Sequence, residues 1–399
     1  MDAPSYPPLR VIVYGGDIAA LETALALREH CGDRCGVMLL SPVRDLPVRT
    51  HAAGASPDEG RGARFDLGAL ASEHELGFRS DAIVAVDPTG REARTITGAR
   101  IRYDALVVAF GARPRGALPG VITCWGSGDA GPLQSLVREL RFGEANRVAF
   151  AIDAGNRWTL PTYELALTAS RFARLAGLES AELSIVTYES RPAELIGPQA
   201  SKTLAKRLAQ AGVELHTGSD PVAFEDGALA LRDGGELEAD RVLAMAAVDG
   251  PRIAGLPRDA EGFLPVDEFG RVRGAPRVWA AGEVTSYPVR QAGLAAQQAR
   301  VVAASIAAEA GVEVHTKPFR PVLRGQLSSR AEPATGNGVN GHGSAISPLL
   351  WWPPEQLAGE HLSAHIADKL DLHAPTGEDS ISVAVELGPD GRRVAARAA

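Results

Sequence analysis

One short stretch near the N-terminus limits what this chain can fold into more than any other part of the sequence. The apolar run Val11–Tyr14 ends at the pair Gly15-Gly16, and an alanine-rich segment, Ala19–Glu29, follows directly. This order predicts a buried strand, a tight turn and a helix, the opening of a Rossmann-type βαβ unit whose helix N-terminus can bind the pyrophosphate of a dinucleotide. Gly15 permits the turn, and the small Ala20 permits close packing of the helix on the strand.

An acid that is present and an acid that is absent both weaken that prediction. Asp17 stands where the second glycine of the G-x-G-x-x-G pattern lets the backbone approach a pyrophosphate. A carboxylate there repels phosphate and can cap the helix instead, so a βαβ unit without a ligand stays an alternative. An acid that binds a ribose is expected about 20 residues further on, at the end of the next strand. Val43 holds that place and Asp45 follows it closely, so Asp45 is either the ribose ligand or an ordinary loop aspartate.

A third signal lies far along the chain. The apolar run Val278–Ala281 leads into Gly282 and Glu283, and a loop and the alanine-rich segment Gly293–Glu309 follow. A carboxylate at that place can accept hydrogen bonds from a polyol, and the N-terminus of the following helix can stabilise an anionic ring. The alternative is a strand, turn and helix in which Glu283 is a capping residue.

The pattern of strands and helices predicts an α/β fold of two Rossmann-like three-layer domains, the second inserted in the first, with a small C-terminal α+β module. We assign residues 9–120 and 262–325 to the first, dinucleotide-binding domain and residues 121–261 to the second. Residues 326–348 are rich in Ser, Gly and Asn and are expected to form a flexible linker or loop. Residues 349–399, which include Trp351-Trp352, form the C-terminal module.

The second unit resembles a nicotinamide-binding domain in its order of elements only. The turn after its first strand, residues 153–161, has no G-x-G-x-x-G pattern. This degenerate turn makes NAD(P)H bound in the usual way less favoured there. Glu189 ends the following strand and is either a ribose ligand or a solvated strand-end acid, and we favour the second.

The composition excludes several classes of function. A net charge of −8 argues against nucleic-acid binding, which needs a basic surface. Three cysteines are too few for a disulfide framework and fit a reducing cytoplasm. The nine histidines are scattered, and we predict no metal site. No apolar run approaches the length of about 18 residues that a membrane span needs, so no transmembrane segment is expected.

Three segments together resemble one enzyme superfamily. They are Gly15–Glu22, Tyr103–Pro114 and Arg277–Gln298. They resemble the pyridine nucleotide-disulfide oxidoreductases, flavoproteins with two dinucleotide-binding domains, and in particular the branch near sulfide:quinone oxidoreductases and type II NADH dehydrogenases. The resemblance extends over roughly residues 10 to 325. It implies an FAD molecule that lies extended in the first domain.

The resemblance also implies a role for each candidate site residue. Gly15 and Gly16 would meet the pyrophosphate, beside Asp17 and Ala20, and Asp45 is the candidate for the ribose. The other implied contacts are the backbone at Ile83 with the adenine, Gly111 with the passing cofactor, Gly282 and Glu283 with the ribityl chain, and the helix start at Gln291, Gly293 and Leu294 with the isoalloxazine.

The chain departs from the family pattern at several of these positions. Asp17 replaces a glycine, Val43 replaces an acid, Glu283 replaces an aspartate, and Arg290 stands where this branch often has lysine. The cysteines that carry disulfide or sulfide chemistry are absent, so both chemistries are disfavoured. No catalytic residue is identified.

We therefore expect an FAD-dependent oxidoreductase that passes hydride or electrons through the flavin. NAD(P)H is the candidate donor, and a quinone or a small molecule is the candidate acceptor. The alternative is a non-catalytic relative with a weakened FAD site that serves as a binding or scaffold module. We expect a cytoplasmic protein, and leave open a peripheral contact with the inner face of the membrane and a homodimer.

Overall fold

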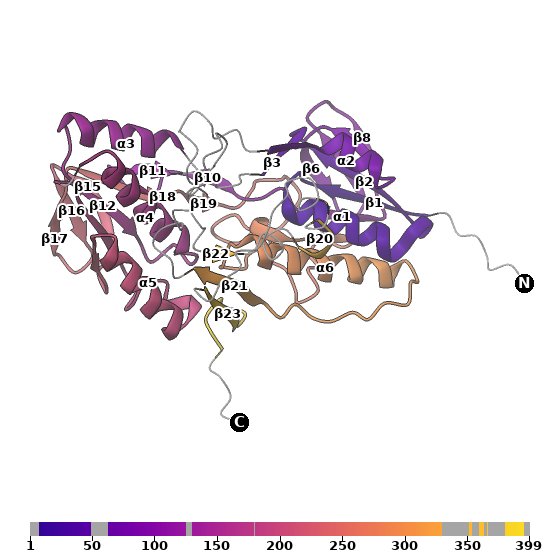
Figure 1. Cartoon of the computed structure of the whole chain (residues 1–399). Coiled ribbons are helices and arrows are strands. Elements are labelled where there is room, and N and C mark those ends of the chain that lie inside the picture. Colours follow the sequence, from indigo (N-terminus) through magenta and orange to yellow (C-terminus); the bar gives the residue numbers. More distant parts are fainter. Residues whose placement is uncertain are drawn as a thin grey trace, which may run out of the picture.

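A computed structural model of the chain describes residues 8–48, 63–124, 130–178, 180–328, 351–352, 359–362, 365 and 380–394. It contains two α/β bodies side by side, each built on a five-stranded parallel sheet (Figure 1). The first sheet takes its last strand from a segment that follows the whole second sheet in the sequence, so the second body is inserted in the first. The predicted fold class is confirmed.

The sheet of the first body has the strand order β20-β9-β1-β2-β5. The predicted strand, turn and helix at the N-terminus are present, because β1 leads directly into α1 and β2 then pairs in parallel with β1. The bounds are β1 (Leu9–Tyr14), α1 (Ile18–Cys31), η1 (Gly32–Arg34), β2 (Cys35–Ser41), β5 (Gly77–Ser80), β9 (Ala105–Val108) and β20 (Val278–Ala280).

Both faces of this sheet are buried, which explains its continuous apolar strands. Val11 and Val13 of β1 lie in the core under α1 and α6 (Ala292–Glu309), whereas Ile12 and Tyr14 lie in the core on the opposite face. Successive side chains of a strand point to opposite faces, so this alternation follows from the pleat. The opposite face is covered by the meander β6 (Ile83–Asp87), β7 (Glu92–Thr95) and β8 (Arg100–Arg102). A hairpin of β3 (Asp45–Val48) and β4 (Ala63–Asp66) precedes α2 (Leu67–Glu73).

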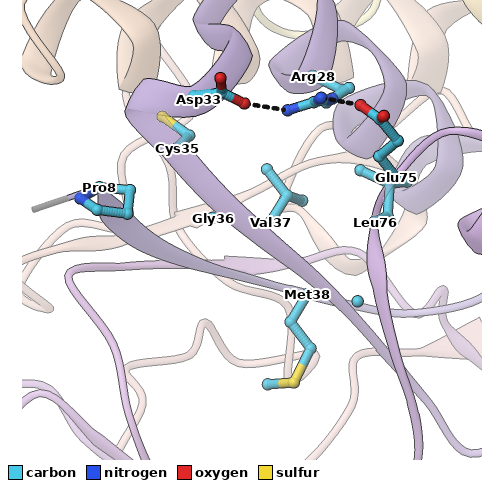
Figure 2. Close-up of a pocket in the computed structure, with 10 residues that line it drawn as sticks. Pro8, Arg28, Asp33, Cys35, Gly36, Val37, Met38, Glu75 and Leu76 are labelled. Carbon is cyan, nitrogen blue, oxygen red and sulfur yellow. Dashed lines mark hydrogen bonds and ion pairs between the residues drawn. The ribbon is translucent and has the colours of Figure 1, made fainter.

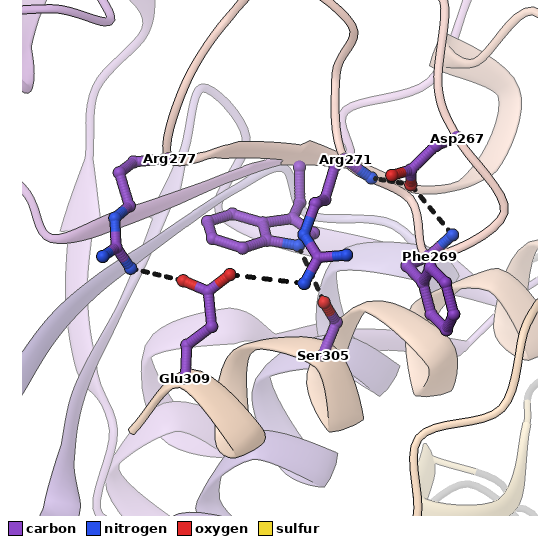
Figure 3. A network of polar contacts seen from close by, with 7 residues as sticks. Asp267, Phe269, Arg271, Arg277, Ser305 and Glu309 are labelled. Atoms are coloured by element: carbon purple, nitrogen blue, oxygen red, sulfur yellow. Dashed lines mark hydrogen bonds and ion pairs between the residues drawn. The ribbon is translucent and has the colours of Figure 1, made fainter. Parts of the chain in front are cut away.

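Polar contacts hold the C-terminal end of α6 to β20 and to the turn before it (Figure 3). The buried Trp279 donates its indole N–H to Ser305 Oγ at 3.2 Å. Glu309, one turn further along α6, pairs with both Arg271 and Arg277. The helix is therefore fixed at this end, and its N-terminus is held at the opposite end of the strand.

The second body repeats the architecture with the strand order β11-β18-β12-β13-β14, in which every pairing is parallel. The meander β15-β16-β17 packs on one face, and three helices belong to this body. The bounds are β11 (Ile122–Cys124), α3 (Ala130–Phe142), β12 (Arg147–Ile152), α4 (Leu160–Leu175), β13 (Glu182–Thr187), η2 (Glu194–Ile196), α5 (Pro198–Gln210), β14 (Val213–His216), β15 (Pro221–Glu225), β16 (Ala228–Leu231), β17 (Glu236–Glu238) and β18 (Arg241–Met245).

Two strands that connect the bodies pair with each other. β10 (Arg113–Arg115) leaves the first body and runs antiparallel to β19 (Ala247–Asp249), which returns from the second. Arg115 and Asp249 reinforce the pair with an ion pair of 2.9 Å. The two passages between the bodies therefore lie side by side (Figure 1).

A small antiparallel sheet of order β22-β21-β23 follows α6. It consists of β21 (Val322–Ser328), β22 (Trp351–Trp352) and β23 (Ser380–Glu386). The limit that we drew at residue 325 falls inside β21, and the rest of the expected linker, residues 329–348, lies outside the described residues. Leu323, Val383 and Val385 join the core of the second body, so this sheet packs against it. None of the helices in the described ranges is long and apolar enough to cross a membrane.

Candidate functional site

The candidate site residues gather at one edge of the first sheet. Gly15 follows β1, Gly111 follows β9, and Gly282 follows β20, and these three strands are neighbours. All of them are parallel, so their carboxyl ends lie at the same edge. The chain proceeds from β1 to β2 on one side and places β9 on the other, so the strand order reverses between β1 and β9. Open α/β sheets bind their ligands at such a switch point.

Gly15 is required by the packing of its turn. Its φ is +149°, and a Cβ atom there would lie 2.1 Å from the carbonyl oxygen of Ala109 and 3.0 Å from the Cβ of Ala20. A Cβ on Gly16 would lie 2.5 Å from Ser41 Oγ. Both glycines therefore let the β1–α1 turn lie close against Ala109 and Ser41. The tight turn predicted at Gly15 and the close packing predicted at Ala20 are both present.

Asp17 is the N-cap of α1. Its carboxylate accepts a hydrogen bond of 2.7 Å from the backbone N–H of Ile18, and the side chain is exposed. One donor at the helix N-terminus is thus already satisfied by a negative charge, at the end of the helix that otherwise attracts anions. The capping role that the sequence offered as an alternative is present.

The end of β2 has no acid. Val43 is 49% exposed there, and its backbone N–H donates to the buried Ser41 Oγ at 3.2 Å. Asp45 lies beyond it as the first residue of β3, with Arg64 at 3.8 Å. The position expected for a ribose ligand is therefore apolar, and Asp45 belongs to a hairpin.

Gly282 is held by α6. Its φ is +81°, and its N–H donates to the side-chain oxygen of the buried Gln298 at 2.7 Å. Thr285 closes the turn by donating its hydroxyl to the Gly282 carbonyl at 2.9 Å. A Cβ on Gly282 would lie 2.8 Å from the Cβ of Ala19, so the turn after β20 lies against the start of α1. Gln298 was not among the candidate residues because it lies almost two turns into α6, away from the glycine turns that marked the site.

Charges of both signs meet beside this turn. The Glu283 residue is exposed to solvent, but the protein atoms around its carboxyl partly desolvate it, and this desolvation raises its pKa. The negative charge of Asp17 raises this pKa further. Arg290 opposes that shift, and burial in turn lowers the pKa of its guanidinium. The guanidinium carbon of Arg290 lies 3.9 Å from the centre of the Phe263 ring, a cation–π contact. Asp17 and Glu283 thus bring two carboxylates to the same edge, with one arginine beside them.

The start of α6 carries a buried donor that has no partner in the described part of the protein. The side-chain oxygen of Gln291 caps the helix by accepting the N–H of Leu294 at 2.9 Å, whereas its Nε2 is buried without a hydrogen bond. Gly293 and Leu294 are buried, and the Leu294 side chain belongs to the core of the second body. At this helix start, the Gln291 amide is the group that can address a ligand.

Two further candidates differ in what surrounds them. Gly111 has a φ of +83°, and apart from its two chain neighbours no atom of the described residues lies within 4 Å of where its Cβ would be, so there is open space beside it in this part of the protein. Ile83 is buried in β6, and its backbone hydrogen-bonds the Tyr14 hydroxyl. Burial raises the pKa of Tyr14, and its ring contacts Phe110 with the centroids 4.6 Å apart.

The favoured interpretation of Glu189 was wrong, because this residue is buried and not solvated. It ends β13 and accepts hydrogen bonds from Tyr163 at 2.8 Å, from Thr159 at 3.2 Å and from the backbone N–H of Glu194 at 2.8 Å. Burial raises the pKa of its carboxyl against these donors. The carboxylate therefore joins α4 to the segment that follows β13.

A pocket of about 450 Å³ lies at the other edge of the first sheet (Figure 2). It is bordered by the amino ends of β1, β2 and β5, and Arg28 crosses it to pair with Asp33 and Glu75. Ligands of parallel α/β sheets bind at the carboxyl ends of the strands, so we do not assign this pocket to the candidate site.

Two parallel sheets, an inserted second body and glycine turns at a switch point define a two-domain dinucleotide-binding protein. The chain belongs to the pyridine nucleotide-disulphide oxidoreductase family, whose profile matches residues 9–311. The resemblance seen in the sequence is confirmed.

Three individual proteins show how far the similarity extends. The chain is 29% identical over 297 residues to an NADH dehydrogenase-like protein of Mycobacterium tuberculosis, over 69% of this chain and 73% of that protein. It is 27% identical over 362 residues to the ferredoxin–NAD(+) reductase component of the biphenyl dioxygenase system of Paraburkholderia xenovorans. This match covers 85% of this chain and 82% of that protein. The solved sulfide:quinone oxidoreductase of Aquifex aeolicus superposes with a TM-score of 0.69 at 19% identity, over 82% and 85%, which is a likeness of fold.

Membership of this family gives FAD as the cofactor and NAD(P)H as its substrate or partner. The residues present fit FAD at the flavin end of the site, where Gly111 has open space beside it and the Gln291 Nε2 donor has no partner among the described residues. At the pyrophosphate end, the backbone at Gly15 and Gly16 fits the cofactor, but the negatively charged Asp17 carboxylate lies beside it.

Proposed function

We propose that this protein is an FAD-dependent oxidoreductase that passes hydride or electrons from NAD(P)H through the flavin to a quinone or a small-molecule acceptor. One observation carries the proposal. The glycine turns after β1, β9 and β20 converge at the switch point of the first sheet, and open space lies beside one of them.

The chain's own residues would hold and orient the cofactor. The α1 N-terminus and the turn at Gly15 and Gly16 would face the pyrophosphate, while Glu283 would accept hydrogen bonds from the hydroxyls of the ribityl chain. The Gln291 amide would donate to the ring system, and Arg290 would place a positive charge near it. FAD, when bound, supplies the hydride and electron transfer at its ring.

The sequence holds three cysteines, Cys31, Cys35 and Cys124, and each is a buried free thiol. A thiol that passes electrons to a disulfide or a sulfur substrate must be accessible. This supports an acceptor other than a disulfide and a donor other than sulfide. The M. tuberculosis relative is named for NADH and the A. aeolicus structure for a quinone, and these two names support our choice of donor and acceptor.

The test begins with the purified full chain and its visible absorption spectrum. We expect the apoprotein to bind one FAD, and NADH or NADPH to bleach the flavin absorbance under anaerobic conditions. A water-soluble quinone should then restore the absorbance. A holoprotein that either nicotinamide nucleotide reduces, but that no quinone or small-molecule oxidant reoxidises, would overturn the proposed acceptor. A holoprotein that neither nucleotide reduces would overturn the proposed donor.

A non-catalytic scaffold is the second candidate, and one observation favours it. The Asp17 carboxylate itself satisfies the Ile18 N–H at the place where a pyrophosphate would bind. A folded protein that binds no FAD at millimolar concentration would support this candidate and exclude the enzyme.

A further inference from the structure

A short C-terminal segment, of which the structure describes residues 359–362 and 365, lies against α1 and α2 of the first body. Its position is fixed by Glu22 of α1, which is fully buried. The Glu22 carboxylate accepts the backbone N–H groups of Glu360, His361 and Leu362 at 2.8, 3.1 and 3.0 Å. Gly359 precedes them, and a Cβ there would lie 2.4 Å from the Glu22 carboxyl carbon. The segment is therefore held in one register.

That register brings four of the chain's nine histidines to one interface. His361 and His365 are four residues apart, and residues 360–362 and 365 are helical, so their side chains project from the same side of the segment. His361 Nδ1 lies 2.8 Å from Glu29, beside His30 in the last turn of α1. His365 Nδ1 lies 3.7 Å from Glu73, beside His74 at the end of α2.

These contacts form two sets: His361 with Glu29 and His30, and His365 with Glu73 and His74. Within the ranges that the structure describes, only the second set has the geometry of a metal site. One ligand atom each of Glu73, His74 and His365 can be chosen so that all three lie within 4.8 Å of one another. The rings of His74 and His365 have their centroids 5.5 Å apart, whereas those of His30 and His361 are 6.3 Å apart.

The surroundings of the second set suit an ion. The His74 Nε2 is buried and has no hydrogen-bond partner among the residues that the structure describes, and the His365 side chain is 6% exposed. Phe65 covers His365 on one side, with ring centroids 6.0 Å apart. A buried imidazole nitrogen without a partner is costly, and a metal bond would satisfy it.

We propose that Glu73, His74 and His365 bind a divalent transition-metal ion, Zn²⁺ or an ion of like preference, which fastens the C-terminal segment to α2. Two imidazoles and one carboxylate are a known Zn²⁺ ligand set, and water completes the tetrahedron. Zn–N bonds of about 2.0–2.1 Å require the ligand atoms to approach one another to about 3.4 Å, which rotation of the side chains provides. The ion holds together residues almost 300 positions apart in the sequence. It is independent of the flavin site.

The chain offers a matched control for this proposal. His361 and His365 lie on the same segment and each pairs with a glutamate, so both contribute to docking, but only His365 belongs to the metal set. The test uses the full chain without an affinity tag, stripped with a chelator and then titrated with ZnCl₂. Calorimetry gives the affinity, and elemental analysis after gel filtration gives the stoichiometry.

We expect one Zn²⁺ per chain in the wild type and in His361→Ala. We expect His74→Ala and His365→Ala each to weaken binding at least about 100-fold, more than the loss of an outer-shell partner does. Hydrogen exchange at residues 360–362 should slow on adding Zn²⁺ to the wild type and not to His74→Ala, which leaves the segment itself unchanged. A wild type that retains no Zn²⁺, or binding in both ligand variants as tight as in the wild type, would overturn the proposal. If an alanine variant fails to fold, Glu73→Gln, at an exposed position, gives the same test.

Discussion

The hydroxyl of Tyr163 donates a hydrogen bond of 2.8 Å to the carboxylate of Glu189, and both side chains are buried. The pair joins the first turns of α4 to the end of β13, where a nicotinamide-binding domain offers its acid to the ribose. In this protein the acid serves the fold. A bound NAD(P)H must therefore obtain its contacts from other groups of the second body.

Glu189 should give stability a recognisable dependence on pH. Burial raises the pKa of this carboxyl, so the native state binds the proton more tightly than the unfolded state. The stabilisation from this group is complete below the ordinary pKa of about 4.3 and is lost as pH rises through the native pKa. We expect the free energy of unfolding of the wild type, relative to Glu189→Gln, to fall as pH rises above that value. Urea denaturation at several pH values measures it, and a difference that does not change with pH would contradict the assignment.

Asp17→Asn should tighten FAD binding. The amide keeps an oxygen that can cap α1, because asparagine is as good an N-cap as aspartate, but it removes the charge beside the pyrophosphate. We expect the Kd for FAD to fall about tenfold, equivalent to about 1.4 kcal/mol. Fluorescence titration of the apoprotein gives the Kd. Asp45→Asn, in the β3–β4 hairpin, is the control and should leave it unchanged. An unchanged Kd in Asp17→Asn would mean that the carboxylate does not face the pyrophosphate.

Two glycine substitutions should separate folding from cofactor binding. Gly111→Ala places a methyl group in open space at a φ of +83°, so we expect a loss of roughly 1–2 kcal/mol of stability and a folded protein. Because that space is where the cofactor passes, FAD affinity should fall at least about tenfold. Gly15→Ala, whose Cβ meets the Ala109 carbonyl oxygen, should lose about 3 kcal/mol or more. Thermal unfolding and FAD titration of both variants check this. Normal FAD affinity in Gly111→Ala would remove this residue from the site.

Glu22→Gln should loosen the C-terminal segment while leaving the first sheet intact. The variant replaces a buried acceptor of three N–H groups by an amide that is uncharged and brings its own donors. Loss of a charged hydrogen-bond acceptor costs about 1.5–3 kcal/mol. Amide exchange should accelerate at residues 360–362, and the amides of β1 should stay protected. Glu29→Gln, an exposed neighbour on the same helix, should have a smaller effect. Equal acceleration in both variants would argue against the role of Glu22.

Local patterns predicted the elements of the first domain well. The expected helix Ala19–Glu29 lies within α1, and the expected strand Val278–Ala281 exceeds β20 by one residue, because glycines and apolar runs determine both locally. The burial and hydrogen bonding of Glu189 could not be predicted, since its donors Tyr163 and Thr159 come from another element. The β3–β4 hairpin was missed because its strands are short and polar.

Long-range partners account for the rest of the difference. β21 pairs with β23 across more than fifty residues, so nothing local marks it as part of the C-terminal sheet. The histidines of the proposed metal site were overlooked for the same reason. No local spacing marks this set, because Glu73 and His74 are neighbours in the sequence whereas His365 is almost 300 positions away.

The pairing of β10 with β19 has a consequence for how such a chain can change over evolution. The inserted body begins and ends at adjacent, hydrogen-bonded points, so it can be exchanged for another module without moving any strand of the first sheet. The exchange is constrained further, because Val289 and Leu294 of the first body, together with the C-terminal sheet, complete the inserted body's core. A replacement module must therefore offer an apolar surface to the start of α6 as well as two neighbouring ends.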